Sequence, residues 1–213
     1  MKSIIILILV CCTLINAKEL KLTKKELEFI KTSPNRSYII NRFKQYKKMR
    51  KKASNLSTPK KLAHVNSFFN KILPVDDETK YNSDDYWATR KEFIIEGRGD
   101  CEDYVIAKYF TLLELGVNKK NLYFAVVKVK GKTSYHMNLM YLETPKSVPL
   151  VLDNLSFKVV PFPLRKKLEP KFVFNEYDAH LLTKKGLGKK VKIDWGEVDK
   201  WKVLLDRVYV KNE

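Results

Sequence analysis

The stretch "GRGDCEDYVIAKYF" (97–110) changes from a glycine-rich turn into a helical pattern at Cys101. Beyond the cysteine, apolar residues recur three and four positions apart, as they do on the buried face of a helix. These residues are Val105, Ile106, Tyr109, Phe110 and Leu113, and Gly116 then ends the pattern. The glycines at 97 and 99 permit the tight backbone conformations that deliver a side chain to a helix N-terminus. We therefore expect a buried helix that begins at Cys101.

The sequence after this helix has the alternation and the β-branched and aromatic residues typical of strands. The candidate strands are "NLYFAVVKVK" (121–130), "YHMNLMYLE" (135–143), "PLVLDNL" (149–155) and "FKVVPF" (157–162). One buried helix followed by consecutive antiparallel strands predicts an α+β fold, with the helix packed on the sheet.

The tail of the chain, residues 163–213, is less regular. It contains a strand-like "KFVFNEY" (171–177), a glycine-lysine loop "KKGLGKK" (184–190) and a last amphipathic segment. The apolar residues of that segment include Trp195, Trp201, Leu204 and Leu205. We expect the tail to close the edge of the sheet.

Three helices are predicted before this core, and together they form an N-terminal helical layer over residues 18–75, followed by the core at 76–213. The first, at 22–30, has Thr23 and Glu26 at the spacing of a capping box. The second, at 37–53, is very basic, and the third begins at Ser57 or Thr58 and is stopped by Pro74.

Residues 1–17 have the pattern of a secretory signal peptide, with Lys2, an apolar run and then Ala17 before charged residues. An uncleaved membrane anchor is the alternative, but the run is shorter than the ~20 residues that span a bilayer. A lipoprotein signal at Cys11 or Cys12 is a further alternative, although bulky Leu9 and Val10 precede these cysteines. We expect cleavage near Ala17 and a periplasmic protein that does not span the membrane.

The chain carries 42 basic and 24 acidic residues, a formal net charge of +18. Export and the scattered distribution of the lysines argue against nucleic acid as the partner. A basic exported protein more plausibly meets acidic protein, an anionic wall polymer or a membrane surface. A non-catalytic binding module that uses this basic surface is therefore one hypothesis for function.

Cys101 is the one cysteine left after removal of the leader, so it has no partner for an internal disulfide. Such a cysteine is either a small buried residue or a reactive nucleophile. A nucleophile needs a nearby base, and the chain offers His64, His136 and His180. We choose His136 because it lies in a predicted strand, whereas His64 belongs to the N-terminal helices and His180 to the tail.

A carboxylate or an amide on a neighbouring strand would orient the histidine. Asp153 stands among apolar residues in "VLDN", where an unpaired acid is costly. Pairing with His136 would fix the tautomer of the imidazole, as in hydrolase triads. Asn154 is the alternative, since some cysteine proteases use an amide.

Three segments resemble the bacterial transglutaminase-like cysteine peptidases, in particular periplasmic members that release large biofilm adhesins. They are "YWATRKEFIIEGRGDCEDYVIAKYFTLLELGV" (86–117), "HMNLMY" (136–141) and "VLDNL" (151–155). The resemblance covers roughly a third of the chain, from about Asp84 to Phe157. Members of the family commonly have proline where this chain has Arg90, a departure that concerns a helix start and not the chemistry.

The resemblance implies a papain-type core in which Cys101 is the nucleophile, His136 the base and Asp153 the orienting acid. It also implies a calcium ion bound by Asp100 and Glu102, which flank the cysteine. Calcium binds six to eight oxygens, so Asp84 and Asp85 in the acidic patch "DDETKYNSDDYW" (76–87) are further candidates, as are Asp103, backbone carbonyls and water. The alternative is that Asp100 and Glu102 only complement the helix dipole, with Asp100 as the N-cap.

The function implied by the resemblance is calcium-dependent cleavage near the N-terminus of a large cell-surface adhesin, which promotes biofilm dispersal. An inner-membrane receptor for cyclic di-GMP is the implied partner that sequesters the protease. The same triad would also serve a transglutaminase or a cell-wall amide hydrolase. The shape of the substrate-binding groove, and not the triad, selects which molecule accepts the acyl group.

Overall fold

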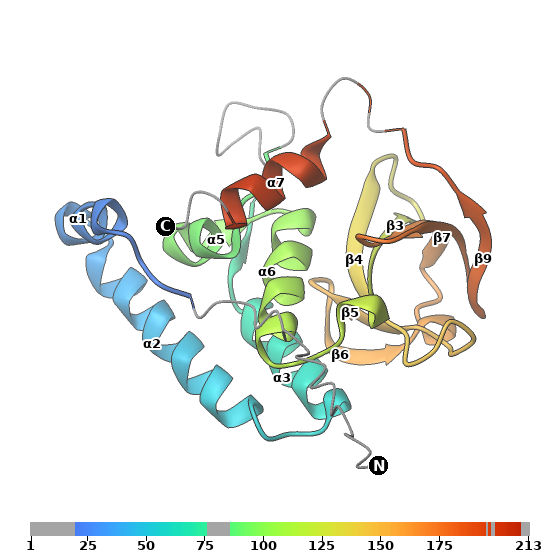
Figure 1. Ribbon diagram of the computed structural model, residues 1–213, viewed down its shortest axis with the longest axis horizontal. Helices are drawn as coiled ribbons and strands as arrows, with labels where there is room; N and C mark the ends of the chain where they lie inside the picture. The colour runs from blue at the N-terminus through green and yellow to red at the C-terminus, as the bar shows by residue number, and fades with distance from the viewer. Residues whose placement is uncertain (1–19, 76–85, 195, 197–198, 210–213) are drawn as a thin grey trace, which may run out of the picture.

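The computed structural model describes residues 20–75, 86–194, 196 and 199–209 of the chain. Helices gather on one side of the molecule and a curved antiparallel sheet on the other, with helix α6 between them (Figure 1). The predicted α+β fold is confirmed.

The N-terminal helices are α1 (Lys24–Thr32), α2 (Arg36–Ala53) and α3 (Thr58–Phe69). The predicted capping box is present, because Thr23 and Glu26 each accept a backbone hydrogen bond from the other. The prediction that Pro74 stops the third helix is wrong. The helix ends at Phe69, and Pro74 lies in the short strand β1 (Leu73–Pro74), where it has no helix to interrupt.

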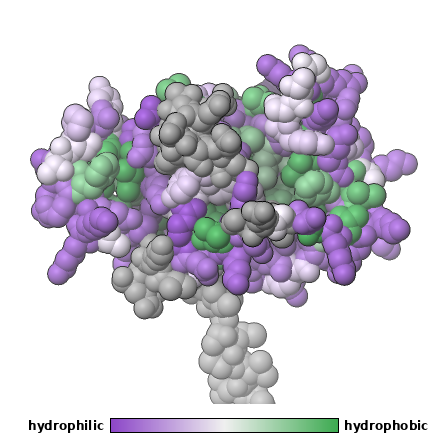
Figure 2. All heavy atoms as spheres, turned by 90° about the horizontal axis from the view of Figure 1, so that it is seen from above, coloured by the Kyte–Doolittle hydropathy of each residue, from purple (hydrophilic) through white to green (hydrophobic). Residues whose placement is uncertain are grey.

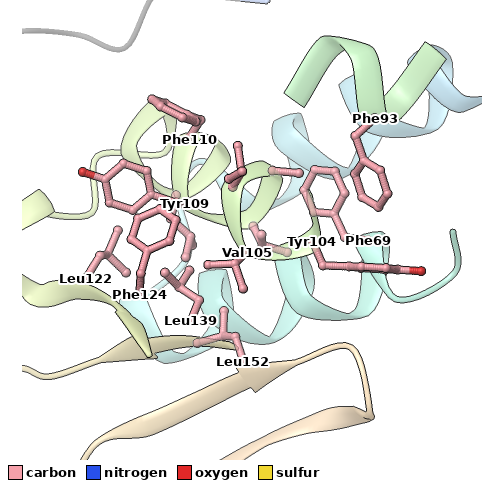
Figure 3. Packing of buried hydrophobic residues seen from close by; sticks show 14 of the residues in the cluster. Phe69, Phe93, Tyr104, Val105, Tyr109, Phe110, Leu122, Phe124, Leu139 and Leu152 are labelled. Atoms are coloured by element: carbon pink, nitrogen blue, oxygen red, sulfur yellow. The ribbon is translucent and has the colours of Figure 1, made fainter. Parts of the chain in front are cut away.

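Helix α6 (Cys101–Glu114) begins at the predicted residue and is buried along most of its length. It follows α5 (Arg90–Glu96) and the short strand β2 (Arg98–Gly99). In Figure 3 α6 carries Tyr104 toward Phe93 on the helical side and Val105 toward Leu139 on the sheet side. Fully burying one such side chain stabilises the fold by about 1.5–3 kcal/mol. The motif helix therefore joins the two layers.

The large sheet has seven strands in the order β6-β5-β4-β3-β7-β8-β9, and all neighbours are antiparallel. The strands are β3 (Leu122–Val129), β4 (Tyr135–Tyr141), β5 (Leu150–Asp153), β6 (Ser156–Pro161), β7 (Leu168–Phe174), β8 (Ala179–Thr183) and β9 (Gly186–Val191). Short 3-10 turns, η1 (Lys119–Asn121) and η2 (Phe162–Leu164), precede β3 and β7. The four predicted strands of the first half of the sheet are present.

The tail differs from its prediction in one way. The stretch 184–190, predicted as a loop, contributes to strand β9, whose two glycines lie at a turn and against the neighbouring strand β8. As predicted, the tail closes the sheet: β7 pairs with the open edge of β3, and β8 and β9 follow to the end of the sheet. Helix α7 (Lys200–Tyr209) then returns across α6, and Trp201 packs edge-on against Tyr109 and Phe124.

Arg90, where the chain departs from the family that its motif resembles, stands at the first position of α5, a position that also suits proline. Its guanidinium donates to Glu114 at 2.6 Å and to the Tyr46 hydroxyl at 2.7 Å. Arg50 pairs with the other oxygen of Glu114 at 2.7 Å. This buried network ties α2 and α5 to the far end of α6, so Arg90 has a structural role that proline could not supply.

Within the described ranges, no helix is long and apolar enough to cross a membrane. Figure 2 shows a face dominated by hydrophilic side chains, with smaller apolar areas among them. This surface agrees with a chain of which 31% of the residues are charged.

Candidate active site

The start of α6 is positioned by a turn that leaves α5. Gly97 ends α5 with a left-handed backbone, at a φ of 72°, which glycine adopts without strain. The guanidinium of Arg42 donates to the carbonyls of Ile94 and Ile95, so the last turn of α5 is satisfied. Strand β2 then pairs in parallel with β1 and delivers the chain to Cys101.

Two side chains of the first turn of α6 fix the helix against its surroundings. Asp103 accepts a hydrogen bond from the Ala88 amide at 2.8 Å, and it is fully buried. The Tyr104 hydroxyl donates to the Ile72 carbonyl, next to β1, at 2.5 Å. The cysteine therefore sits on a helix end that is held from both sides.

Gly99→Ala should destabilise the protein and reduce the reactivity of Cys101. A Cβ at this position would lie 2.2 Å from an oxygen of Asp103 and 2.8 Å from the ring of Phe93, both inside the core. We expect a loss of about 1–3 kcal/mol of unfolding free energy, measured by denaturant titration. Gly131→Ala is the control: its φ of 82° strains an alanine, but no atom lies within 4 Å of the added Cβ, so stability should fall while thiol reactivity stays unchanged. Equal reactivity in both variants would contradict this packing argument.

The Cys101 sulfur contacts strand β4 as well as its own helix. The backbone N–H of Met137 donates to the sulfur at 3.4 Å, and the thiol donates to the Glu102 carboxylate at 3.0 Å. Burial, followed by the charge of Glu102, raises the pKa of the Cys101 thiol well above its ordinary value. With only protein groups present, the site therefore holds a neutral thiol.

His136 and Asp153 are brought together as predicted. His136 lies on β4 and Asp153 at the end of β5, and Nε2 of the imidazole is 2.8 Å from Oδ1 of the carboxylate. The partner is thus Asp153 and not Asn154. Within the described part of the chain, no hydrogen bond joins the imidazole to the sulfur, but His136 adjoins Met137, whose N–H reaches that sulfur. The His136-Asp153 pair is therefore linked to Cys101 through the Met137 amide, where α6 begins beside β4.

The other two histidines have local roles. Nδ1 of His64 is 2.9 Å from the carbonyl of Lys60 on the same helix, and Nδ1 of His180 is 3.1 Å from the carbonyl of Gly188 on the next strand. Neither position is on the strand that contacts Cys101. The choice of His136 among the three histidines agrees with this geometry.

Two cations near Asp153 were not predicted. Arg165 donates through Nη2 to Oδ2 of Asp153 at 2.6 Å. Lys108 is fully buried on α6, and burial lowers its pKa to about 7, against the opposing effect of Asp153. The sequence does indicate that Asp153 needs a partner, because a buried acid is costly when unpaired. It does not identify the partner, because Arg165 is followed by two lysines and the pattern does not show which of the three side chains turns inward.

The carboxylates around Cys101 have the oxygen chemistry that calcium prefers. Asp100 occupies the N-cap position of α6, yet its side chain makes no capping hydrogen bond, so the capping alternative lacks its defining contact. Asp84 and Asp85, the other predicted ligands, lie outside the described residues. Among the residues that are described, no three acidic, histidine or cysteine side chains are arranged to hold a metal. Asp100 and Glu102 therefore fit calcium by type but supply only part of a ligand set.

A cysteine at the start of a buried helix, packed on an antiparallel sheet that carries a His-Asp pair, defines the core of a papain-type cysteine peptidase. Residues 27–169 match the family model of the bacterial transglutaminase-like cysteine proteinases. The chain belongs to this family and is a cysteine protease, which excludes the hypothesis of a purely non-catalytic binding module. The comparison with curated protein sequences gives no match.

Solved structures of Legionella pneumophila LapG are similar over most of the chain. The EGTA-treated form is 32% identical, with a TM-score of 0.68, and the match covers 85% of this chain and 94% of LapG. The calcium-bound form is 31% identical with the same TM-score, and the match covers 85% of this chain and 96% of LapG. The long match confirms the family that the motif segments indicated.

Proposed function

We propose that the protein is a calcium-dependent periplasmic endopeptidase that uses a Cys101-His136-Asp153 triad. The observation that carries this proposal is the 2.8 Å hydrogen bond between His136 and the buried Asp153, one residue from the backbone amide that contacts the Cys101 sulfur. Family membership supplies the reaction class, which is hydrolysis of a peptide bond in a protein substrate.

In the proposed mechanism, His136 removes the proton of the Cys101 thiol and later delivers it to the leaving amine. Because Asp153 engages Nε2, the neutral imidazole carries its proton there and presents Nδ1 as the base. For this step the thiol turns from Glu102, its present acceptor, toward the imidazole. Asp153 then stabilises the imidazolium while the thiolate attacks the peptide carbonyl.

The tetrahedral intermediate needs donors for its oxyanion. The backbone N–H of Cys101 is one candidate, because the first N–H groups of a helix have no partner within the helix. The dipole of α6 adds to the stabilisation of negative charge at this end. Water then hydrolyses the acyl-enzyme, with His136 as the base.

Asp100 and Glu102 are the side chains that would hold calcium. The similarity to the calcium-bound form of LapG supports this assignment. Bound calcium supplies positive charge that offsets the carboxylates beside the thiol. Glu102 then has a second role, because binding the metal would free the thiol from the hydrogen bond that Glu102 now accepts.

The proposed substrate is the N-terminal region of a large cell-surface adhesin, whose cleavage releases it and promotes biofilm dispersal. Support comes from the resemblance over residues 84–157 and from the match to LapG. The leader at 1–17, which directs the protein to the periplasm in this proposal, lies outside the described residues. An inner-membrane receptor for cyclic di-GMP is the proposed partner that sequesters the enzyme.

Purified protein incubated with calcium, the adhesin N-terminal region and a fluorescent amine should yield two adhesin fragments without incorporated amine. Mass spectrometry of the products is the measurement, and Cys101→Ala protein is the control. Incorporation of the amine would assign a transglutaminase, because the acyl-enzyme is then taken by the amine. Intact adhesin together with cleavage of cell-wall peptides would assign the amide hydrolase.

A further inference from the structure

Arg165 lies directly behind the proposed triad. It follows η2, and its Nη2 is 2.6 Å from Oδ2 of Asp153, the oxygen that His136 does not use. The Asp153 side chain is fully buried, while 15% of the Arg165 side chain is exposed. The acid is thus held on one oxygen by the base and on the other by a cation.

The backbone around Arg165 is fixed by hydrogen bonds from two directions. The Arg165 N–H donates to the Phe162 carbonyl, and the Arg165 carbonyl accepts a hydrogen bond from the Leu168 amide at 3.0 Å. Lys184, from the hairpin between β8 and β9, also donates to that carbonyl at 3.0 Å and lies over the buried ring of Phe162. The guanidinium therefore projects from an ordered support, which the tail of the chain supplies.

Asp153 needs such support to remain ionised. Burial alone raises the pKa of its carboxyl, but His136, Arg165 and the amide of Leu155 together bring that pKa below the ordinary value. His136 is neutral for part of the catalytic cycle, and burial lowers the pKa of nearby Lys108 to about 7. The guanidinium of Arg165 stays charged throughout, so it is the permanent cation beside Asp153.

We propose that Arg165 is a positioning residue of the active site, which orients the Asp153 carboxylate so that its Oδ1 holds the Nε2–H tautomer of His136. The inference rests on the triad proposed above and concerns a residue outside it. Arg165 acts through Asp153, and it touches neither the thiol nor the imidazole by a hydrogen bond.

The test uses two measurements that need no substrate, both on calcium-loaded protein. Iodoacetamide alkylation reports the reactivity of Cys101, and ¹⁵N NMR reports the tautomer of His136, which is one of only three histidines. Arg165→Met should slow alkylation roughly tenfold or more, because the substitution removes a hydrogen bond between charged groups and the free energy of such a bond corresponds to a factor of about ten or more. It should also reduce the Nε2–H population of His136. Arg165→Lys, which keeps the charge, should restore most of the alkylation rate of Cys101 and most of the Nε2–H population of His136.

A double-mutant cycle shows whether Arg165 acts through the acid. Asp153→Asn should slow alkylation by itself, and adding Arg165→Met should then have little further effect. Arg50→Met is the matched control, because it also removes an arginine from a buried carboxylate, Glu114, away from the site. The control should lower the melting temperature without changing either signal.

The outcomes separate this inference from the proposed function. Slow alkylation of wild-type Cys101, unaffected by Asp153→Asn, would remove the triad itself. Fast wild-type alkylation that falls with Asp153→Asn but not with Arg165→Met would retain the triad and overturn the role of Arg165. Additive losses in the double mutant would overturn it as well, because Arg165 would then act by another route.

Discussion

Cys101→Ala is expected to reduce peptide cleavage by a factor on the order of 10⁴ or more, to below detection, while the protein stays folded. No other described cysteine could replace the nucleophile. The sulfur is small, and the helix around it is held by Asp103 and Tyr104, so the fold does not depend on the thiol. The measurement is the rate of fragment formation, with circular dichroism as the check on folding.

His136→Ala should have a comparable effect, because it removes the base. Asp153 would keep its ion pair with Arg165, so the variant does not leave an unpaired buried acid and should remain folded. His180→Ala is the matched control, since that histidine bonds a carbonyl on the far side of the sheet. Cleavage that survives in either Cys101→Ala or His136→Ala would remove the nucleophilic mechanism.

Chelation of calcium with EGTA should stop cleavage and lower the melting temperature. Two carboxylates flank the Cys101 thiol, and its pKa is raised mainly by burial and further by the charge of Glu102. Formation of the thiolate is therefore opposed unless a cation is present. Calcium that binds the folded state alone also stabilises it by mass action. Calorimetry and the cleavage assay, each with and without EGTA, measure the two effects.

Glu102→Gln sharpens the calcium test. In EGTA this variant should alkylate faster than the wild type at neutral pH, because the charge that raises the pKa of the thiol is gone. In calcium it should fail to reach the wild-type rate, because a ligand is lost. If EGTA changes neither melting nor cleavage in the wild type, Asp100 and Glu102 serve only the helix N-terminus.

The position of the candidate site residues could be predicted because these residues carry local signals. Cys101 marks a change from a turn to a helical pattern, and His136 is the histidine of a clear strand. Asp153 stands among apolar residues, where an acid requires a partner, and the structure supplies His136 at 2.8 Å. Each inference depended on a few neighbouring residues, which is the range over which sequence patterns are informative.

The parts that were missed depend on long-range contacts. Gly186 and Gly188 suggested a loop, although β9 is stabilised by pairing with β8 and not by its own propensity. Arg165 could not be distinguished from its lysine neighbours until the fold placed it against Asp153. The position of β7 beside β3 is likewise a property of the whole sheet, which strand patterns do not encode.

The central place of β7 has a consequence for biosynthesis. Strand β3 pairs with β4 on one side and with β7 (168–174) on the other. Until residue 174 has left the ribosome, β3 keeps an open edge with unpaired backbone groups. The support of Arg165 comes later still, because Lys184 belongs to the following hairpin. A nascent chain would thus acquire its proteolytic competence only after residue 184 has emerged, and chains truncated before β7 should aggregate through that edge.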